Sequence, residues 1–423
     1  MITSRRSFLA AALVAGASGA FLPRLGLGVG PTVFPRAGKR LLILGGTGFL
    51  GPAVVEAAKA QGWSVSLFNR GRTEQRKGTI EDVEKFYGNR DPDKRAVDTD
   101  ETSPRGLEQL EAAVKAGTRW DAVLDNSGFY PRHVKASAEL LSKAADRYIF
   151  ISTISVYASN EQKNADESAA LGTIADPTVE TMGTQGENYG PLKALCEQAA
   201  AAAFGKRALS IRPGFIVGSR DDSDRFTYWP VRAAAGGPML IPGSPEHPVQ
   251  FIDVRDLANF IMASISTNAS GAVNATGPVK PDPKGDWGVL VAACLAAAKA
   301  SGKTPAEPVW VESRFLQAQG VLIGGEIPIY IPPEGEAAGF HARSIKRAIE
   351  LGLKTRPMEE TCAAVLAWWP GEVERRTRVT KQLMEEAEKA GRPAPQTPDP
   401  ALLRTGLRPD REAELLKAWG ERK

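Results

Sequence analysis

The chain has 423 residues, of which 43% are hydrophobic and 24% charged, and its formal net charge is +4. That length allows two domains or one large domain with a cap, and the composition is that of an ordinary soluble globular protein. The near-neutral charge gives no support for a nucleic-acid or anionic-membrane partner, while three scattered cysteines and three histidines offer no metal pattern and no even set of disulfides, so we expect no metal site.

The chain opens with an arginine pair, Arg5 and Arg6, followed by an apolar run rich in alanine and glycine over 8–21. The run is too short and too rich in glycine to span a bilayer as a stable helix, and it ends in small residues. These features resemble a twin-arginine export signal. We therefore expect a signal peptide over 1–20, a linker over 21–38, and export to the bacterial periplasm by the twin-arginine machinery. The alternative is an ordinary N-terminal arm that happens to be apolar.

A short, continuously apolar run over 40–44 has the pattern of a buried parallel strand. A glycine-rich turn over 45–51 and a helical stretch over 48–61 follow it. Glycines at this spacing permit a tight turn, close approach of the backbone to a pyrophosphate and close packing of helix on strand, and the helix N-terminus favours phosphate. The pattern predicts dinucleotide binding rather than a plain structural turn. The expected cofactor contacts are Gly45, Thr47, Gly48, Phe49, Leu50 and Gly51.

A second strand, over 64–68, ends at Asn69 with no carboxylate to hold the ribose hydroxyls of NAD. Arg70 and Arg72 follow, and their guanidinium groups suit a 2′-phosphate. The sequence therefore favours NADP, with NAD as the alternative cofactor. A solvated basic loop is the alternative interpretation of the two arginines.

Further strands are predicted over 83–87, 121–125, 147–151, 209–212 and 249–253. Helical stretches alternate with them, over 104–116, 131–145, 189–204 and 254–267. This alternation predicts an α/β fold with a doubly wound parallel Rossmann sheet over 39–280, whose ligands bind at the carboxyl ends of the strands.

Hydroxyl groups gather at the carboxyl end of the strand over 147–151, where Ser152 and Thr153 follow. Farther along, Tyr189 and Lys193 open a helix and share one face because they are four residues apart. A nearby ammonium favours the phenolate form of tyrosine, as acid–base catalysis requires. Lys193 is also placed to donate to the nicotinamide ribose, and a hydroxyl of Thr153 or Ser152 to hold the substrate oxygen. The alternative for Tyr189 is a half-buried structural aromatic.

Together these motifs resemble the extended short-chain dehydrogenase/reductase superfamily, in its NAD-dependent epimerase/dehydratase group, over about 39–280. The resemblance implies Thr153, Tyr189 and Lys193 as the catalytic set, because the hydroxyl stands three residues before Val156-Tyr157. It also implies cofactor contacts from the turns after the third and fourth strands, and a substrate cleft bordered by the Arg-Pro strand. The residues that match these positions are Asn89, Arg90, Asn126, Ser127 and Arg212.

Departures from the family pattern narrow the chemistry. Ile154 and Ser155 stand where sugar-nucleotide dehydratases carry an acid pair, so elimination of water is disfavoured. Val249 or Gln250 stands where many nucleotide-sugar epimerases place an arginine for the substrate pyrophosphate, which weakens that substrate class. Arg225 is a candidate contact for an anionic substrate, or else an exposed loop charge.

Past residue 280 the pattern changes to a smaller substrate-binding lobe over 281–370 and a charged helical tail over 371–423. Trp368 and Trp369 are expected to end a helix, and a proline-containing break over 392–395 divides the tail into two amphipathic helices. The tail is expected to wrap the domain or a partner subunit of a homodimer.

The sequence thus predicts an exported oxidoreductase or epimerase that acts on a carbonyl or hydroxyl of a small substrate, sugar-derived substrates included. Because free nicotinamide cofactor is scarce outside the cytoplasm, a tightly bound, self-regenerating cofactor is expected. The alternative is a cofactor-binding protein without chemistry, such as a sensor, a scaffold or a relative of RNA-binding proteins. The charge speaks against RNA, and the intact Tyr189, Lys193 and Thr153 set speaks against a scaffold.

Overall fold

The computed structural model describes residues 38–74, 78–278, 282 and 285–422. The predicted signal peptide and nearly all of the predicted linker lie outside these residues. The chain divides into two compact units that interleave along the sequence, whereas the predicted domains follow one another in chain order. Unit 1 comprises Met1–Val156, Gly172–Ile211 and Ile261–Ala272, and unit 2 comprises Tyr157–Leu171, Arg212–Phe260 and Val273–Lys423.

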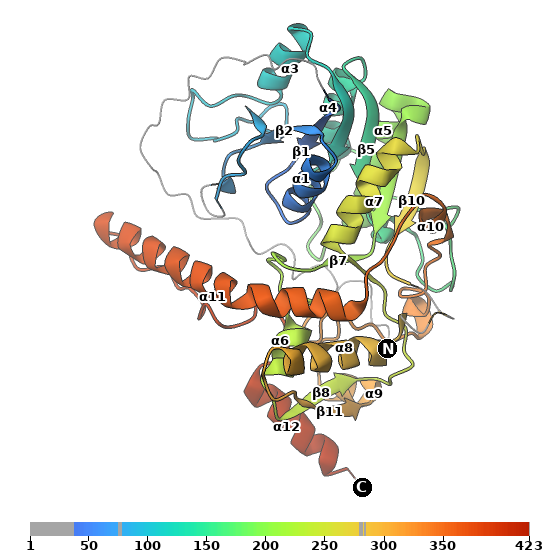
Figure 1. Cartoon of the computed structure of the whole chain (residues 1–423), viewed down its shortest axis with the longest axis vertical. Coiled ribbons are helices and arrows are strands. Elements are labelled where there is room, and N and C mark those ends of the chain that lie inside the picture. The colour runs from blue at the N-terminus through green and yellow to red at the C-terminus, as the bar shows by residue number, and fades with distance from the viewer. Residues whose placement is uncertain (1–37, 75–77, 279–281, 283–284, 423) are drawn as a thin grey trace. The chain divides into compact units, whose positions relative to one another are not determined.

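The described part of the chain contains a seven-stranded sheet with the order β10-β6-β5-β4-β1-β2-β3 (Figure 1). Its strands are β1 (Arg40–Leu44), β2 (Ser64–Asn69), β3 (Glu84–Tyr87), β4 (Trp120–Asp125), β5 (Ala145–Ile151), β6 (Ala208–Pro213) and β10 (Gly271–Ala275). The helices between them are α1 (Leu50–Ala60), α3 (Glu108–Lys115), α4 (Pro131–Leu141), α5 (Tyr189–Phe204) and α7 (Val254–Ser266). The predicted doubly wound α/β fold is confirmed.

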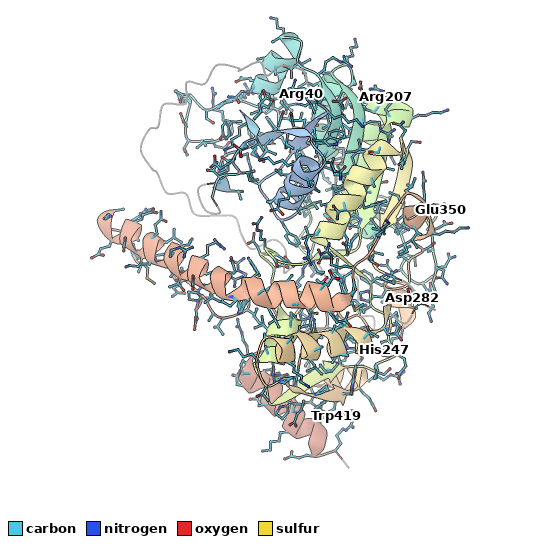
Figure 2. All side chains as sticks on the ribbon, in the orientation of Figure 1. Arg40, Arg207, His247, Asp282, Glu350 and Trp419 are labelled. Carbon is cyan, nitrogen blue, oxygen red and sulfur yellow. The ribbon has the colours of Figure 1, made fainter. Side chains whose placement is uncertain are left out.

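The strand β1 lies between β2 and β4, and the strand order reverses there. Leu41 pairs in parallel with Val65 on one side and with Ala122 on the other. Its neighbours Leu42, Ile43 and Leu44 are also fully buried, as expected for a strand covered on both faces. Arg40 (Figure 2) fixes the start of the strand, because its guanidinium group pairs with Glu84 of β3 at 3.1 Å. Ligands of such sheets bind at the reversal point, so a ligand is expected at the loops that follow β1 and β4.

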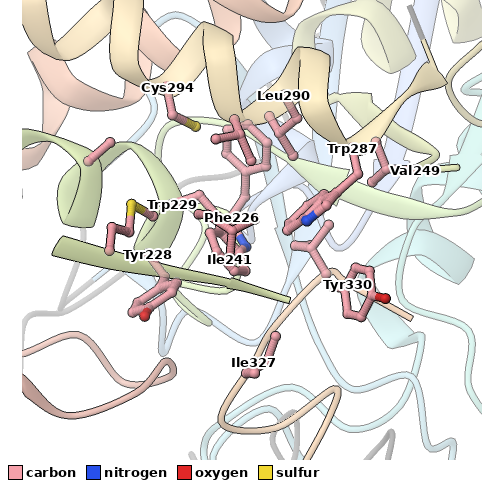
Figure 3. Close-up of a cluster of buried hydrophobic side chains, with 14 of the residues drawn as sticks. Phe226, Tyr228, Trp229, Ile241, Val249, Trp287, Leu290, Cys294, Ile327 and Tyr330 are labelled. Carbon is pink, nitrogen blue, oxygen red and sulfur yellow. The ribbon is translucent and has the colours of Figure 1, made fainter. Parts of the chain in front are cut away.

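Unit 2 has its own apolar core, centred on Trp229, Trp287 and Tyr330 (Figure 3). The two indole rings meet edge to face with centroids 4.8 Å apart, and each ring N–H donates to a proline carbonyl. The helices and strands of unit 2 are β7 (Phe215–Val217), β8 (Pro238–Pro242), β9 (Phe251–Asp253), β11 (Glu307–Val311), α6 (Tyr228–Ala234), α8 (Trp287–Ala300), α9 (Ser313–Ala318), α10 (Lys346–Glu350), α11 (Met358–Lys389) and α12 (Pro409–Gly420).

The predicted strand over 249–253 is shorter than expected and lies outside the large sheet. It appears as β9, which pairs in parallel with β7 alone in a two-stranded sheet. The outer position next to β6 belongs to β10, which the sequence analysis did not predict. β10 reads Gly-Ala-Val-Asn-Ala, and glycine, alanine and asparagine are poor strand formers, so its pairing depends on tertiary contacts.

The prediction that a helix ends at Trp368 and Trp369 is wrong. α11 continues through Pro370 to Lys389. A proline removes one helical hydrogen bond, but the next turns are anchored by Arg376, which pairs with Glu372 at 2.9 Å and with Asp224 at 2.6 Å. The predicted break over 392–395 falls between α11 and α12. Within the described residues, no helix is both long enough and apolar enough to cross a membrane.

Candidate active site

The glycine turn joins β1 to α1 as a compact, closed loop. Gly45 has a φ of +91°, which glycine adopts readily, and its N–H donates to the Phe68 carbonyl at 3.0 Å. A Cβ on Gly51 would lie 2.1 Å from the Gly46 carbonyl oxygen, so α1 packs directly on the turn. A Cβ on Gly46 would lie 2.5 Å from Leu67. These three glycines are therefore needed for the fold of the turn.

Gly48 differs from the other glycines of the turn because its surroundings are open. A Cβ at this position would meet no atom of the chain within 4 Å. The helix α1 begins two residues later, and its N-cap residue, Phe49, provides no side-chain hydrogen bond to the first N–H groups. An open glycine beside uncapped N–H groups suits a phosphate, whose charge the helix dipole favours. The turn thus fits the pyrophosphate of a dinucleotide.

The segment after β4 touches the glycine turn. The Asn126 side chain donates to the Gly45 carbonyl at 3.3 Å, and the Ser127 hydroxyl donates to the Leu44 carbonyl at 3.0 Å. A Cβ on Gly45 would lie 2.6 Å from that of Ser127. The structure therefore brings the two predicted cofactor segments together, as the parallel pairing of β1 and β4 requires.

Arg90 follows β3, and its side chain binds the end of β4 and the segment that follows it. Both terminal nitrogens of its guanidinium bind Asp125, at 2.6 and 2.8 Å, and the Ser137 and Ser127 hydroxyls lie at 2.9 and 3.4 Å. The Tyr148 hydroxyl donates to the same carboxylate at 2.6 Å. Arg90 thus ties the loop after β3 to the end of β4 and to α4. Asn89 is also engaged within its own loop, where its amide donates to the Arg95 carbonyl at 2.8 Å.

Lys193 on α5 is buried, and its ammonium group donates to two backbone carbonyls. One is that of Gly128 and the other that of Ile151, each at 2.7 Å. The ammonium also lies 4.1 Å from the centre of the Phe150 ring. Burial lowers the pKa of Lys193 from 10.5 to about 8. The lysine is therefore held in one position between the end of β5 and the cofactor segment.

Tyr189 is half-buried at the first position of α5, one helical turn before Lys193. Gly190 allows this position, because a Cβ there would lie 2.1 Å from the Ser155 carbonyl oxygen. The start of the helix is thus pressed against the turn that follows β5. The ring of Phe129, which is 44% exposed, lies 6.4 Å from the Tyr189 ring, centroid to centroid.

Thr153 is buried at the end of β5, and its hydroxyl oxygen accepts the Ser155 backbone N–H at 3.1 Å. The same hydroxyl donates to the Ser155 hydroxyl at 3.1 Å, and Ser155 is exposed. The oxygen of Thr153 is therefore fixed, while its proton points to a surface group that a substrate oxygen can replace. The neighbouring Ser152 hydroxyl is buried and has no hydrogen-bond partner among the described residues.

The residues expected to select the cofactor follow β2. Asn69 is buried, and its amide oxygen lies 3.5 Å from the Thr47 hydroxyl. Arg72 is exposed and pairs with Asp98 at 3.3 Å, while Arg70 is exposed as well. Two guanidinium groups therefore stand just past the end of β2, where the adenosine ribose binds in Rossmann folds.

The two predicted substrate arginines belong to unit 2. Arg212 is buried, and its Nη1 donates to the Tyr157 hydroxyl at 3.0 Å. Arg225 is half-buried, and its Nε donates to the Ser223 hydroxyl at 2.8 Å. The structure therefore places neither of them in the unit that carries the glycine turn and Lys193.

Sequence reasoning missed the two carbonyls that hold Lys193, those of Gly128 and Ile151, and the exposed ring of Phe129. Backbone carbonyls carry no signal in the sequence. The position of Phe129 directly after Gly128 at the end of β4 is a signal that was available.

A cluster of Asp91, His133 and Glu180 has its ligand atoms within 4.8 Å of one another. Arg132 donates to Asp91 at 3.0 Å and to Glu180 at 2.6 Å, so a guanidinium group already compensates both carboxylates. This cluster therefore does not require a metal ion.

Comparisons with known proteins identify the family and the fold. A model of the NAD-dependent epimerase/dehydratase family matches residues 41–276. The epimerase family protein SDR39U1 of Bos taurus is 23% identical over 254 residues, which cover 56% of this chain and 74% of that protein. WbmH of Bordetella bronchiseptica, solved in complex with NAD+, has a TM-score of 0.53 at 16% identity, covering 79% of this chain and 99% of its own. UDP-N-acetylglucosamine 4-epimerase from Bacillus cereus has a TM-score of 0.50 at 16% identity, with coverages of 78% and 99%.

Proposed function

Because the chain belongs to the NAD-dependent epimerase/dehydratase family, we propose that it is an NAD(P)-dependent oxidoreductase or epimerase of the extended short-chain dehydrogenase type. It acts on a carbonyl or hydroxyl carbon of a small substrate, and the epimerase among the structures of the same fold makes a sugar derivative the first class to test. The observation that carries the proposal is the fixed, buried ammonium group of Lys193 on the same helix face as Tyr189.

Each of three side chains has one task in this reaction. As a phenolate, Tyr189 accepts the proton of the substrate hydroxyl, and as a phenol it returns it; the Lys193 ammonium favours the phenolate form. The Thr153 hydroxyl gives up its hydrogen bond to Ser155 and donates to the same substrate oxygen. A nicotinamide, when bound, would supply the hydride chemistry at the substrate carbon.

Elimination of water is not part of the proposed reaction. Dehydration of this kind needs a carboxyl group that can donate and accept a proton beside the reacting carbon. Ile154 is buried and apolar, and Ser155 is a hydroxyl, so the turn that carries Thr153 offers no such group at these two positions.

The cofactor we propose is NADP, because Arg70 and Arg72 follow β2 and β2 ends in Asn69 rather than in an acid. NAD is the alternative, and WbmH was solved with NAD+. We further propose that the cofactor stays bound through the reaction cycle. Native mass spectrometry of the purified chain tests this, and a mass without any nucleotide would count against it.

The catalytic proposal is tested by Tyr189→Phe. The matched control is Tyr228→Phe, which removes a buried hydroxyl of unit 2, whereas Tyr189 and Lys193 belong to unit 1. Both variants and the wild type are loaded with NADP and mixed with a panel of sugar nucleotides and simple hydroxy compounds. Net oxidation is followed by the absorbance of the reduced nicotinamide, and epimerisation by chromatographic separation of the epimeric products. We expect Tyr189→Phe to bind NADP normally and to lose turnover by at least about 100-fold, with Tyr228→Phe unchanged. Unchanged turnover of Tyr189→Phe refutes the mechanism.

We also propose that the protein is exported by the twin-arginine pathway, on the strength of Arg5, Arg6 and the apolar run that follows. Export of a folded chain would carry the bound cofactor out of the cytoplasm. Replacing both arginines by lysine is expected to leave the precursor in the cytoplasm. Normal accumulation in the periplasm contradicts this proposal.

A further inference from the structure

Arg343 is a charged side chain of unit 2 with no exposed surface. Its Nη2 donates to the Ser159 carbonyl and to the Asn160 side-chain oxygen, each at 2.7 Å. Its Nε and Nη1 are buried and have no hydrogen-bond partner among the described residues. A guanidinium group has five N–H bonds to satisfy, so more than half of the capacity of Arg343 is unused.

A second guanidinium group lies close to the first. The Cζ of Arg343 is 4.0 Å from the centre of the Tyr157 ring, and the Cζ of Arg212 is 5.0 Å from it. Burial and the charge of Arg212 both lower the pKa of Arg343. Within the described part of the chain, Arg343 makes no ion pair with a carboxylate. A buried positive charge without a counter-charge destabilises the fold, so a reason for keeping it is required.

Glu167 is the acid of unit 2 that lies near this cluster, and its side chain has another use. Its carboxylate accepts the Asn274 backbone N–H at 2.7 Å. The Asn274 side chain in turn accepts the Tyr157 hydroxyl at 2.6 Å. Burial raises the pKa of Tyr157, and the charge of Glu167 raises it further. The charge of Arg343 therefore has no carboxylate partner among the described residues.

The backbone of Arg343 is held firmly by one side chain. The Gln250 oxygen accepts the Arg343 N–H at 2.8 Å, and the Gln250 amide donates to the Arg343 carbonyl at 3.0 Å. The same amide donates to the Gly277 carbonyl. Gln250 is itself buried. This clamp fixes the base of the arginine, which is the preorganisation that a binding group needs.

We propose that Arg343, together with Tyr157 and Arg212, forms an anion-binding site that takes a carboxylate or phosphate group of the substrate. That the anion belongs to the substrate rests on the proposed function, whereas the binding of an anion does not. Guanidinium groups bind both of these oxyanions with paired, charge-assisted hydrogen bonds. An anion at Nε and Nη1 satisfies the N–H bonds that the chain leaves unused and neutralises the buried charge.

The segment 159–165 supplies both acceptors of the Arg343 guanidinium group, so it is the part that has to give way to an anion. It is joined to 339–344 by backbone hydrogen bonds, from Gly339 to the Asn160 carbonyl at 2.7 Å and from Asn164 to the Ala342 carbonyl at 2.6 Å. Since Arg343 itself holds Ser159 and Asn160, an anion that competes for the guanidinium group loosens this segment.

The test is a calorimetric titration of the full chain, without cofactor, by inorganic phosphate and separately by succinate, with ionic strength held constant by chloride. We expect saturable binding of at least one anion, and the two titrations distinguish phosphate from carboxylate. Arg343→Gln is expected to weaken it at least about tenfold, since it removes the charge and the paired donors. The matched control is Arg314→Gln, because the Arg314 side chain is 85% exposed. Binding that is absent from the wild type, or unchanged in Arg343→Gln, overturns the proposal.

A second variant keeps the proposal testable even where Arg343→Gln does not fold. Asn160→Ala removes one partner of the guanidinium group and leaves its charge in place. The anion site predicts that Asn160→Ala binds the same anion at least as tightly as the wild type. A purely structural role for Arg343 predicts that Asn160→Ala has lower thermal stability and binds no anion. That result contradicts the proposal. Because no turnover is measured, failure of the anion site and failure of the Tyr189 mechanism remain distinguishable.

Discussion

The ammonium nitrogen of Lys193 lies 2.7 Å from the carbonyl oxygen of Gly128. Gly128 ends the segment whose Asn126 and Ser127 side chains bind the glycine turn. The helix that carries Tyr189 is thus connected, through one short segment, to the loop that fits the pyrophosphate. In the proposed mechanism, the proton-transfer group and the cofactor site are therefore positioned by the same stretch of backbone.

The first prediction concerns the effect of pH on Lys193→Met. Burial lowers the pKa of Lys193 from 10.5 to about 8, so between these values the unfolded chain holds more protons at this group than the folded chain. The contribution of Lys193 to the free energy of unfolding therefore rises with pH across that window. Below the window, the folded chain carries the full energetic penalty of the buried ammonium charge. We expect the wild type to gain up to about 3 kcal/mol over Lys193→Met across the window, measured by urea denaturation.

The control for this experiment is Lys206→Met, which removes an exposed lysine outside the site. Its stability should run parallel to that of the wild type at every pH. A constant difference between the wild type and Lys193→Met, from neutral pH to above 10.5, would show that the lysine does not titrate in this window.

The second prediction separates two glycines of the same turn. Gly48→Ala places a methyl group in space that the chain leaves open, so we expect normal thermal stability and at least about tenfold weaker NADP binding. Gly51→Ala places it 2.1 Å from the Gly46 carbonyl oxygen, so we expect a clear loss of thermal stability. Differential scanning calorimetry and a fluorescence titration with NADP measure the two effects. Equal behaviour of the two variants would refute the assignment of the open side to the cofactor.

The third prediction concerns cofactor choice. Asp98 pairs with Arg72 at 3.3 Å and so competes with a 2′-phosphate for the guanidinium group. Arg72→Ala should weaken NADP binding by about tenfold and leave NAD binding nearly unchanged. Asp98→Asn should strengthen NADP binding. A titration in which neither variant changes the ratio of the two affinities would mean that Arg72 does not contact the 2′-phosphate.

The sheet of unit 1 could be predicted because its information is local. β1 follows the continuously apolar pattern of a buried strand, the strands predicted after it appear as β2 to β6, and α5 begins at Tyr189 as expected. The contact between the glycine turn and Asn126 follows from two loops at the same end of neighbouring parallel strands. These inferences need only the period of the pattern and the direction of the strands.

The remainder could not be predicted because it depends on distant pairing. Nothing in the composition of β10 distinguishes it from a loop, and only its place beside β6 makes it a strand. The unused hydrogen bonds of Arg343 are likewise visible only when Gln250 and Tyr157 surround it. The sequence around Pro370 predicts a helix end. α11 continues past it, and the turns that follow are held by the pair of Arg376 with Asp224, which is 152 positions away.

That ion pair gives the last prediction. Arg376 and Asp224 are both buried, and their side chains bind through two hydrogen bonds at 2.6 and 2.9 Å. Arg376→Met leaves Asp224 buried without a counter-charge, so we expect a loss of about 3–5 kcal/mol in the free energy of unfolding. The double variant Arg376→Met with Asp224→Asn removes both charges and should recover most of it. A double-mutant cycle in urea measures the coupling. Additive losses would show that the pair does not anchor α11, and that another contact carries the helix past Pro370.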